Sequence, residues 1–418
     1  MKQEFLFNLS HPETDAFLEY KRKREPAFDF RSIPASSGVY GIHPYPAMFH
    51  FRVVRQLLSQ FSSKSQWVFD PFMGSGVAAV ESLIHQRHFI GYDINPLAIL
   101  IAKVRTTPLP RALLSRTLQH LIAHFPRIAP TPINFRNIHY WFDDATIEKL
   151  SRLRQAIFHL EDSAIRNFFL VSFAETVRRV SRTKYNEFKL LRKKQETSQD
   201  VLQTFQATSL RNIDLLTRFY RSHPASPSTV ILQEQNILHN PPLENESIDL
   251  VLTSPPYGDS RTTVAYGQFS RLALQWLGIE ERVDKTSLGS KACEITSDLP
   301  SPLLYHSLEK IEARDEKRAR EVFAFYKDLL AAIRTIGAIV RPGGHVCFVV
   351  GNRRVKEIEL PTDKISADFF ESVGFTHLQT IVRAISNKRM PSENSPSNVK
   401  GKKSSTMRYE YIVVLQKQ

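Results

Sequence analysis

The sequence has 418 residues, of which 42% are hydrophobic and 23% are charged. This length and apolar content exclude a wholly disordered chain, and they leave room for two or three domains or for one large domain with an insertion. The 56 lysines and arginines exceed the 42 acidic residues, and the resulting net charge of +14 favours polyanionic partners. The two cysteines are too few for a disulfide scaffold or a cysteine zinc cluster, and we expect no metal site.

The apolar residues are distributed as in a protein that stays in water. No uninterrupted apolar run approaches the ~18 residues that a membrane-spanning helix needs, which excludes a transmembrane protein. Acidic residues interrupt the N-terminal stretch MKQEFLFNLSHPETD, so it lacks the apolar region of a signal peptide. We therefore expect a soluble, cytoplasmic protein.

The first part of the chain changes from a charged extension to alternating strands and helices. Residues 1–37 are charged and weakly patterned, and we expect them to form an N-terminal extension on the surface. Apolar runs then predict short strands at 66–70 and 88–93. A helix is predicted after each strand, the first at 77–85 and the second after the capping pair Asn95-Pro96.

The middle of the chain, residues 111–227, has a different pattern. Its apolar residues recur three and four positions apart, which predicts helices. This stretch holds 19 lysines and arginines and 10 acidic residues, a net charge of +9. We interpret it as a basic helical insertion. Concentrated positive charge is typical of a nucleic-acid contact, although a solvated basic helix surface is an equally good reading of the charge alone.

From residue 228 to the end, the chain returns to alternating strands and helices. Strands alternating with helices predict an α/β fold with a mostly parallel sheet. The last two strands lack an intervening helix, so we expect them to pair antiparallel at an edge. The strands complete a seven-stranded sheet, and the core domain comprises residues 38–110 and 228–418. The predicted strands are 229–234, 247–253, 345–350, 377–385 and 409–415, and the predicted helices lie near 322–339 and 366–373.

The first strand ends in the turn DPFMGSG, with Gly74 and Gly76 before the helix. Glycines there let the backbone approach a ligand closely, beside the free N–H groups of a helix N-terminus. Asp93 follows about 18 residues later, at the end of the second strand, where a carboxylate can accept both hydroxyls of a ribose. The turn lacks the GxxxxGK[ST] pattern of phosphate-binding loops. A nucleoside cofactor is therefore favoured over a purely structural glycine turn.

A second motif, Thr253-Ser254-Pro255-Pro256-Tyr257, directly follows the apolar strand IDLVL. Taken alone, it would be a proline turn that ends a buried strand. Together with DPFMGSG and GYDINPLA, however, it resembles the motifs of the S-adenosylmethionine-dependent DNA amino-methyltransferases, whose usual forms are DPFxGSGT and (S/D/N)PPY. Val77 stands where that family commonly has threonine. The resemblance covers residues 38–108 and 228–418 and leaves the helical insertion aside.

The resemblance implies a Rossmann-like methyltransferase fold, with S-adenosyl-L-methionine as cofactor and double-stranded DNA as substrate. The segment HPYPAMF is similar to the family segment beside the methionine end of the cofactor. Asn236 follows the third strand and is a candidate for contacting the adenine N6, or else an ordinary polar loop residue. The cofactor-binding candidates are Tyr45, Phe49, Asp70, Pro71, Phe72, Gly74, Gly76, Asp93, Asn95 and Asn236.

The second motif also has a chemical reason for its residue types. An exocyclic base amine is a poor nucleophile because its lone pair is delocalised into the ring. If Ser254 Oγ and the Pro255 carbonyl accept hydrogen bonds from the amine, the nitrogen is drawn towards tetrahedral geometry and its lone pair becomes available. Pro256 stiffens the loop, and Tyr257 offers an aromatic face to a base that has left the duplex stack.

The identity of the base and the class of function remain open at this point. Serine at position 254, preceded by Thr253, resembles the N4-cytosine branch of the family more than the N6-adenine branch. A tRNA base methyltransferase is less consistent, because residues 1–37 are too short for the usual RNA-binding domain. A binding protein with a dead site is argued against by the intact Ser254 and Asp93. The family also implies a possible cognate restriction endonuclease.

The DNA contact is predicted from basic residues in the insertion and after the catalytic motif. Residues 178–194 hold eight lysines and arginines and one acidic residue, although an ordinary solvated surface would read the same way. Residues 386–406 are polar and basic and suggest a loop that follows the DNA backbone. The DNA-binding candidates are Arg178, Arg179, Arg182, Lys184 and Arg261.

Overall fold

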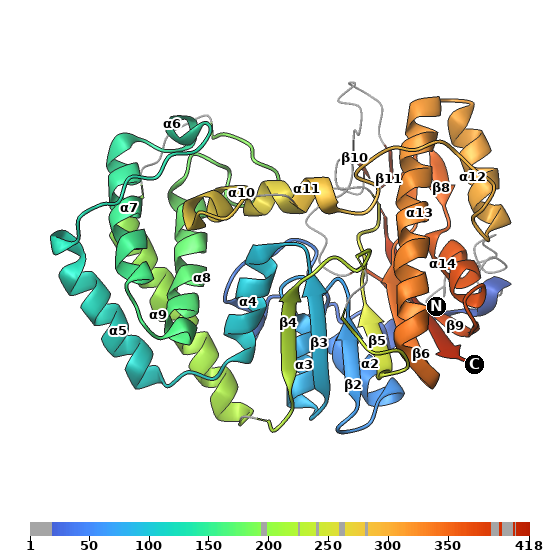
Figure 1. The fold of residues 1–418 in the computed structure, drawn as a ribbon, viewed down its shortest axis with the longest axis horizontal. Helices are drawn as coiled ribbons and strands as arrows, with labels where there is room; N and C mark the ends of the chain where they lie inside the picture. Colours follow the sequence, from blue (N-terminus) through green and yellow to red (C-terminus); the bar gives the residue numbers. More distant parts are fainter. Residues whose placement is uncertain are drawn as a thin grey trace, which may run out of the picture.

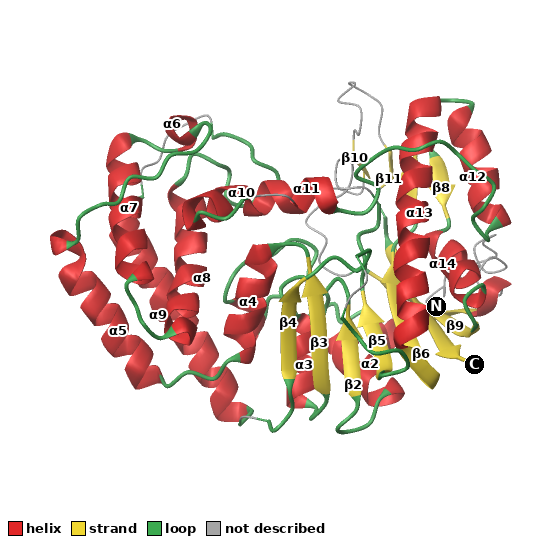
Figure 2. Cartoon of the chain, viewed as in Figure 1, coloured by secondary structure: helices red, strands yellow, loops and turns green. Residues whose placement is uncertain are grey.

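A computed structural model describes seven stretches of the chain and, in addition, the backbone of 393–394 and 404–405. One central sheet has helices on both faces, and a further group of helices stands beside it (Figures 1 and 2). The described stretches are 19–193, 199–224, 226–239, 242–258, 264–280, 283–385 and 407–418.

The sheet has eight strands in the order β1-β9-β12-β6-β5-β2-β3-β4. β4, β3, β2, β5 and β6 are parallel neighbours, and β12 is antiparallel to both β6 and β9. This order and direction confirm the mostly parallel α/β fold with a Rossmann-like methyltransferase sheet. The strands are β1 (Arg22–Arg24), β2 (Trp67–Asp70), β3 (His88–Asp93), β4 (Val230–Glu234), β5 (Ile248–Thr253), β6 (Val340–Val350), β9 (Phe375–Ala384) and β12 (Tyr409–Lys417).

Two features of the sheet correct the sequence prediction. The reversed strand, β12, lies between β6 and β9 and is therefore internal rather than at an edge. An eighth strand comes from the expected surface extension, because β1 pairs in parallel with β9 at the edge of the sheet. The side chain of Arg22 in β1 holds this strand through an ion pair of 2.7 Å with the buried Asp363.

Alternating side chains of the strands divide the core into two layers. Val68 and Phe89 face one layer with helices α2, α3 and α4, whereas Phe69 and Ile90 face the other with α12, α13 and α14. Both faces are apolar, as expected for a parallel sheet covered on both sides. These helices are α2 (Phe51–Phe61), α3 (Val77–Ile84), α4 (Pro96–Thr106), α12 (Pro302–Glu312), α13 (Glu316–Ile339) and α14 (Thr362–Glu371).

The stretch 111–227 is largely helical, as its apolar spacing predicts, and it forms the group of helices beside β4 (Figure 1). α10 (Tyr266–Leu277), which follows the SPPY motif in the sequence, packs into the same group. Its Trp276 is buried against Phe142 and Phe173, and the Trp276 carbonyl accepts a hydrogen bond of 2.8 Å from Arg154 Nε. The other helices are α5 (Arg111–His124), α6 (Ile138–Trp141), α7 (Asp144–Phe158), α8 (Ser163–Val180) and α9 (Val201–Ser222).

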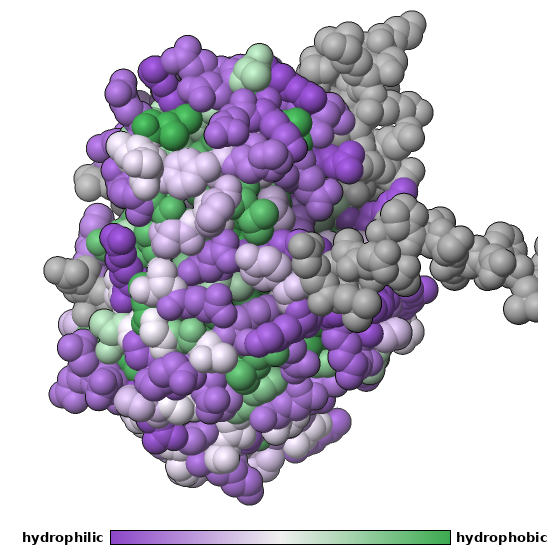
Figure 3. Space-filling view, turned by 90° about the vertical axis from the view of Figure 1, so that its right-hand side faces the viewer, coloured by the Kyte–Doolittle hydropathy of each residue, from purple (hydrophilic) through white to green (hydrophobic). Residues whose placement is uncertain are grey.

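The carboxyl ends of β2, β3 and β5 meet at one edge of the sheet, and α10 and α11 (Val283–Thr286) pass over this edge (Figure 1). In open α/β sheets this edge is where ligands bind. A side view towards α12–α14 shows a mostly hydrophilic surface with apolar side chains in small, separate patches (Figure 3). Among the described residues, no helix is long and apolar enough to cross a membrane.

Candidate active site

The ends of β2 and β5 are joined by a buried hydrogen bond. The hydroxyl of Thr253, the last residue of β5, donates to Asp70 Oδ1 over 2.6 Å, and the Phe72 amide donates to the same oxygen over 3.1 Å. Burial raises the pKa of Asp70 to about 7 despite these two bonds. The Asp70 carboxyl thus connects the glycine turn after β2 with the start of the SPPY motif.

The turn between β2 and α3 depends on glycine at two positions. Gly76 caps α3 with φ of 79°, and a Cβ added to it would lie only 2.6 Å from the Cβ of Ala102 in α4. Gly74 has φ of 52°, and an added Cβ would lie 3.3 Å from the ring of Tyr45. Only glycine adopts this left-handed backbone without strain while leaving the N-terminus of α3 open to a ligand.

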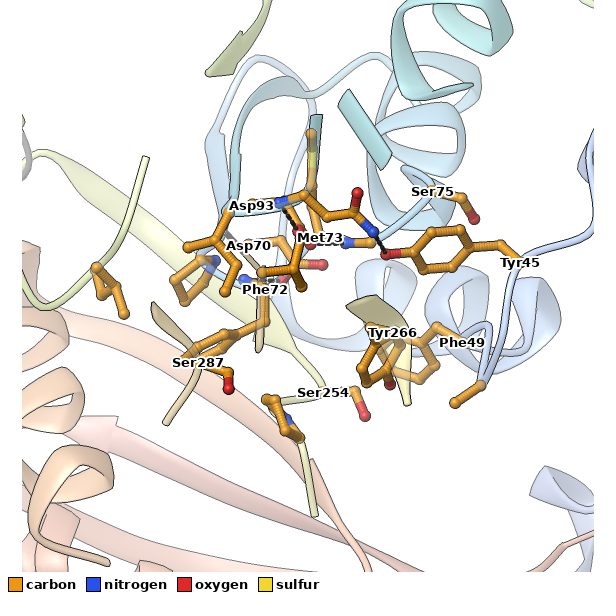
Figure 4. A pocket seen from close by; sticks show the side chains of 18 of the residues that line it. Tyr45, Phe49, Asp70, Phe72, Met73, Ser75, Asp93, Ser254, Tyr266 and Ser287 are labelled. Atoms are coloured by element: carbon orange, nitrogen blue, oxygen red, sulfur yellow. Dashed lines mark hydrogen bonds between the residues drawn. The ribbon is translucent and has the colours of Figure 1, made fainter. Parts of the chain in front are cut away.

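Asp93, at the end of β3, faces this turn (Figure 4). Its Oδ2 accepts a hydrogen bond of 2.8 Å from the Gly74 amide, and its Oδ1 accepts one of 2.8 Å from the Asn95 amide. Each carboxylate oxygen keeps a second acceptor position, which suits the two hydroxyls of a ribose. Burial raises the pKa of Asp93 to about 6, so the group is mostly ionised at neutral pH.

Asn95 is buried, and its side chain links three segments. Its Oδ1 accepts a hydrogen bond of 3.2 Å from the Leu97 amide at the start of α4. Its Nδ2 donates to Tyr45 Oη over 3.1 Å and to Ser270 Oγ of α10 over 2.8 Å. Asn95 therefore positions the Tyr45 ring at the pocket (Figure 4).

These residues line one pocket at the carboxyl edge of the sheet (Figure 4). Nine of the ten predicted cofactor residues lie in its wall; Gly76 does not, and acts through the turn described above. The pocket combines an acidic group, aromatic faces and a helix N-terminus, which are the features that a nucleoside with a charged amino-acid tail requires. The predicted cofactor residues in the wall are Tyr45, Phe49, Asp70, Pro71, Phe72, Gly74, Asp93, Asn95 and Asn236.

The Asn236 amide is already engaged in holding its own surroundings. Its Nδ2 donates to the Thr286 carbonyl of α11 over 3.1 Å, and its Oδ1 accepts from the Leu238 amide over 3.0 Å. These bonds fix α11 against the loop after β4. Asn236 keeps one N–H for a ligand, and its contact with adenine stays a prediction.

The structure places the SPPY motif at the far wall of the same pocket. Ser254 and Pro256 line the pocket, whereas Pro255 is buried and Tyr257 lies behind Ser254. The Ser254 hydroxyl donates to Tyr257 Oη over 3.2 Å. Burial is the main cause that raises the pKa of Tyr257 well above its ordinary value, so the phenol keeps its proton. The motif thus presents a hydroxyl to the cavity and keeps an aromatic ring directly behind it.

The predicted DNA-binding residues are not equally placed. Arg178 is only 4% exposed, its guanidinium lies 4.4 Å from the centre of the Phe269 ring, and it donates to the Phe269 carbonyl over 3.4 Å. This position corrects the expectation of a phosphate contact, because the charged group is used inside the fold. Arg179 is partly exposed and pairs with Glu175 over 2.7 Å.

The remaining candidates lie closer to solvent or outside the described residues. Arg182 is half-buried and donates to the His139 carbonyl over 2.9 Å, while Lys184 is exposed. Both lie on the helical region, and the contact of either with DNA stays a prediction. Arg261 and most of residues 386–406 lie outside the described residues.

Several wall residues were not predicted from the sequence. Met73, Ser75 and Ile94 lie inside the quoted motifs, so the motif boundaries could have included them. The wall formed by α11 and the residues after it carries no sequence signal, because its position depends on contacts with the loop after β4 and with α13. Pro46, Ala47 and Met48 also line the wall, and they belong to the segment HPYPAMF that the resemblance had indicated. The wall residues that sequence analysis did not assign to the pocket are Met73, Ser75, Val77, Ala78, Ile94, Gln235, Ile237, Tyr266, Val283, Thr286, Ser287 and Leu288.

Comparisons with known proteins show the family of this chain. A family model described as DNA methylase matches residues 10–104. The Type II methyltransferase M.MvaI of Kocuria varians is 37% identical over 412 residues, which cover 89% of this chain and 90% of that protein. The chain belongs to the DNA methyltransferase family. Enzymes of this family take the methyl group from S-adenosyl-L-methionine, and the pocket described above has the groups that this cofactor needs.

Other relatives are more distant. The Type II methyltransferase M.MjaII of Methanocaldococcus jannaschii is 35% identical over 101 residues, which are 24% of this chain and 19% of that protein. A solved structure of a putative DNA modification methylase from Thermus thermophilus, complexed with S-adenosyl-L-methionine, is 18% identical and covers 42% of this chain and 50% of its own, with a TM-score of 0.21. The fold assignment therefore depends on the sheet order rather than on superposition. Among the described residues, no group of three or more histidines, cysteines or acidic residues could hold a metal ion.

Proposed function

We propose that this DNA methyltransferase acts on the exocyclic N4 amine of cytosine at a specific site in double-stranded DNA. The observation that carries the proposal is the position of Ser254, a neutral hydroxyl in the wall of the pocket that fits the cofactor. Asp70 connects the two halves of this pocket through its bond with Thr253. A methyl donor in the pocket and an amine at Ser254 would therefore lie next to each other.

The chain's own residues would bind and orient the methyl donor. Asp93 would accept the ribose hydroxyls, and the glycine turn would let the backbone approach the ligand closely. Tyr45, held by Asn95, and Phe49 would cover the methionine end. When bound, S-adenosyl-L-methionine supplies an electrophilic methyl group on a positively charged sulfur.

The SPPY motif would prepare the amine. Ser254 Oγ and the Pro255 carbonyl are the acceptors for its two N–H groups, and they draw the nitrogen out of conjugation with the ring. The two prolines hold these acceptors before the base arrives, so that little conformational entropy is lost at reaction. A target inside the duplex has to leave the stack to reach this loop.

The helical region of residues 111–227 is our candidate for target recognition. Its exposed Lys184 and partly exposed Arg182 would contact phosphates. α10, which follows the SPPY motif in the sequence, packs against α8 of this region and would couple the two. We further propose that a cognate restriction endonuclease accompanies the enzyme, since its 37% identical relative is described as a Type II methyltransferase.

The deciding experiment is nucleoside mass spectrometry on DNA and tRNA from a methylation-deficient host that expresses the protein. We expect N4-methylcytosine in DNA from the wild type and none from Ser254→Ala. Ser247→Ala is the matched control, because Ser247 precedes β5 at its opposite end and its hydroxyl donates to the nearby Glu244 carbonyl. N6-methyladenine in DNA would overturn the assignment of cytosine as the target base. Methylated tRNA together with unmodified DNA would overturn the proposal that DNA is the substrate.

A further inference from the structure

Behind Ser254, the structure contains a line of side chains that leads from the loop after β5 to the strands β12 and β9. Tyr257 Oη, which accepts the Ser254 hydroxyl hydrogen, donates to Glu410 Oε1 of β12 over 3.2 Å. The other Glu410 oxygen accepts a hydrogen bond from Arg383 Nη1 of β9. Arg383 and Glu410 are directly opposite each other in the β9–β12 register, so backbone pairing holds the two side chains together.

The far end of this line is firmly held. The Arg383 side chain is 5% exposed, and its Nε donates to the Phe28 carbonyl over 2.8 Å. The Glu410 side chain is 18% exposed. Gly351, just after β6, lies against the Tyr257 ring, since a Cβ added to it would lie 2.9 Å from Tyr257 Cδ2. Burial, a backbone hydrogen bond and close packing thus hold the ion pair and the ring in place.

The hydrogen-bonding chemistry of the four groups determines which of them donates to which. A guanidinium only donates hydrogen bonds, and a carboxylate only accepts them. Glu410, paired with Arg383, therefore takes the Tyr257 hydrogen. The Tyr257 oxygen is then left to accept from Ser254, and the Ser254 hydrogen points away from the pocket. The lone pairs of Ser254 Oγ remain for a group inside the pocket.

We propose that Glu410 is a positioning residue that fixes the Ser254 hydroxyl as an acceptor for the exocyclic amine, through the phenol of Tyr257. The inference rests on the proposed function, because it specifies how Ser254 recognises an NH₂ group. It also assigns a role to Tyr257 beyond stacking, and it explains why a tyrosine rather than a phenylalanine stands behind the serine.

Exchange of Glu410 for glutamine reverses which group donates and which accepts in the hydrogen bonds from residue 410 to Ser254. Because Arg383 only donates, the amide oxygen of Glu410→Gln faces Arg383 and the amide NH₂ faces Tyr257. The phenol then accepts from the amide and donates to Ser254, and the serine turns its own hydrogen into the pocket. The variant keeps the shape of the site, but it presents a donor where an amine needs an acceptor.

The test compares binding as well as rate. For wild type and Glu410→Gln, we would measure affinity for a duplex with the target cytosine and for one with uracil at that position, whose O4 accepts a hydrogen bond where cytosine donates. The preference for cytosine over uracil should fall at least tenfold in the variant, and single-turnover methylation should fall by a similar factor. S-adenosyl-L-methionine affinity should change by less than twofold.

Two further variants separate this role from a structural one. In a Tyr257→Phe background, which removes the hydroxyl, Glu410→Gln should change the rate by less than twofold. Glu316→Gln is the matched control, because Glu316 is an exposed glutamate paired with Arg320 on α13, far along the chain from the motif. An unchanged base preference, or an equal loss of rate in the Tyr257→Phe background, would overturn the proposal.

The outcomes for the two proposals are distinguishable. If the wild type produces N6-methyladenine, the cytosine assignment is wrong, and the same comparison is made with adenine and hypoxanthine. A fall in the preference for the amine would then still support the role of Glu410. If the wild type methylates neither base in DNA, the proposed function and the amine-acceptor role are both overturned.

Discussion

The glycine turn gives the sharpest quantitative prediction, because the chain offers a matched pair of glycines. Gly76 has φ of 79°, and a Cβ added to it would lie 2.6 Å from Ala102 Cβ and 3.1 Å from Ala102 Cα. Gly343 has nearly the same φ of 75°, but nothing lies within 4 Å of its added Cβ. Alanine at either position meets the same backbone strain, and only alanine at 76 also collides with α4.

The two substitutions should therefore differ by the cost of the collision. A non-glycine residue in the left-handed region costs roughly 1–2 kcal/mol, which is the loss expected for Gly343→Ala. Inserting a methyl group into a closed contact adds about 1–3 kcal/mol. Gly76→Ala should therefore lower the free energy of unfolding by about 2–5 kcal/mol. Moving the start of α3 should also weaken binding of S-adenosyl-L-methionine.

Urea unfolding of the two variants and the wild type measures this difference, with titration calorimetry for the cofactor. The comparison is valid where the denaturant slope is the same for all three proteins, since a change in slope indicates a change in the unfolded state. Equal loss of stability in both variants, or full cofactor affinity in Gly76→Ala, would refute the claim that the approach of α3 to α4 requires glycine here.

Three further predictions follow from burial and charge. Because burial raises the pKa of Asp70 to about 7, the folded state retains a proton that the unfolded state loses. This group should therefore lower stability by at most about 4 kcal/mol as pH rises from about 4 to 7. In pH-dependent unfolding, Asp70→Asn should remove this contribution and leave that of Asp93. The pKa of Asp93 is raised by burial to about 6, so the affinity for the cofactor should weaken roughly tenfold between pH 7 and pH 5 as the carboxylate gains a proton. Calorimetry should find no such pH dependence of the cofactor affinity in Asp93→Asn. The double variant Arg182→Glu, Lys184→Glu should flatten the salt dependence of DNA affinity. Arg178→Ala should instead lower the midpoint of unfolding, because Arg178 is buried. If Arg178→Ala flattened the salt dependence and the double variant did not, the DNA contact would lie at Arg178.

The motifs that line the pocket were predictable because each is a short, continuous stretch of sequence. The turn around Gly74 and Gly76, the acid Asp93 and the serine Ser254 each follow a short apolar strand. The parallel order of β3, β2 and β5 then brings the ends of these strands to one edge. Alternating strands and helices were enough to predict a mostly parallel sheet, in which such strand ends share one edge. The order of the strands, which makes β3, β2 and β5 neighbours, comes from the structure alone.

The edge strand β1 could not be predicted in the same way. Its sequence, Arg22-Lys23-Arg24, has no apolar alternation, and it pairs with β9 more than 350 positions further along the chain. Backbone hydrogen bonds and the ion pair of Arg22 with Asp363 hold it there, and neither leaves a local pattern. The extra strand also explains why β9 is not the edge of the sheet.

Arg178 was misread for a related reason. A run of basic residues predicts a solvated surface. Successive side chains of an α-helix point in different directions, however, and Arg178 lies on the buried side of α8 with Ala174 and Val177. A cation is tolerated there because the ring of Phe269 and backbone carbonyls surround it. The charge run alone could not show that Arg178, near the end of α8, lies on the inner face of that helix.

The position of Tyr45 illustrates what packing adds to the motif. Its segment is clamped from two sides by arginines far apart in the sequence. Arg105 of α4 donates to the Tyr40 carbonyl over 2.6 Å and to the His43 carbonyl over 3.1 Å, and Arg211 of α9 donates to the Ile42 carbonyl over 3.0 Å. One arginine comes from a helix that covers the sheet and the other from the helical region. Because both bind the same few backbone carbonyls, the helical region is part of the support of the pocket, and its removal should weaken cofactor binding.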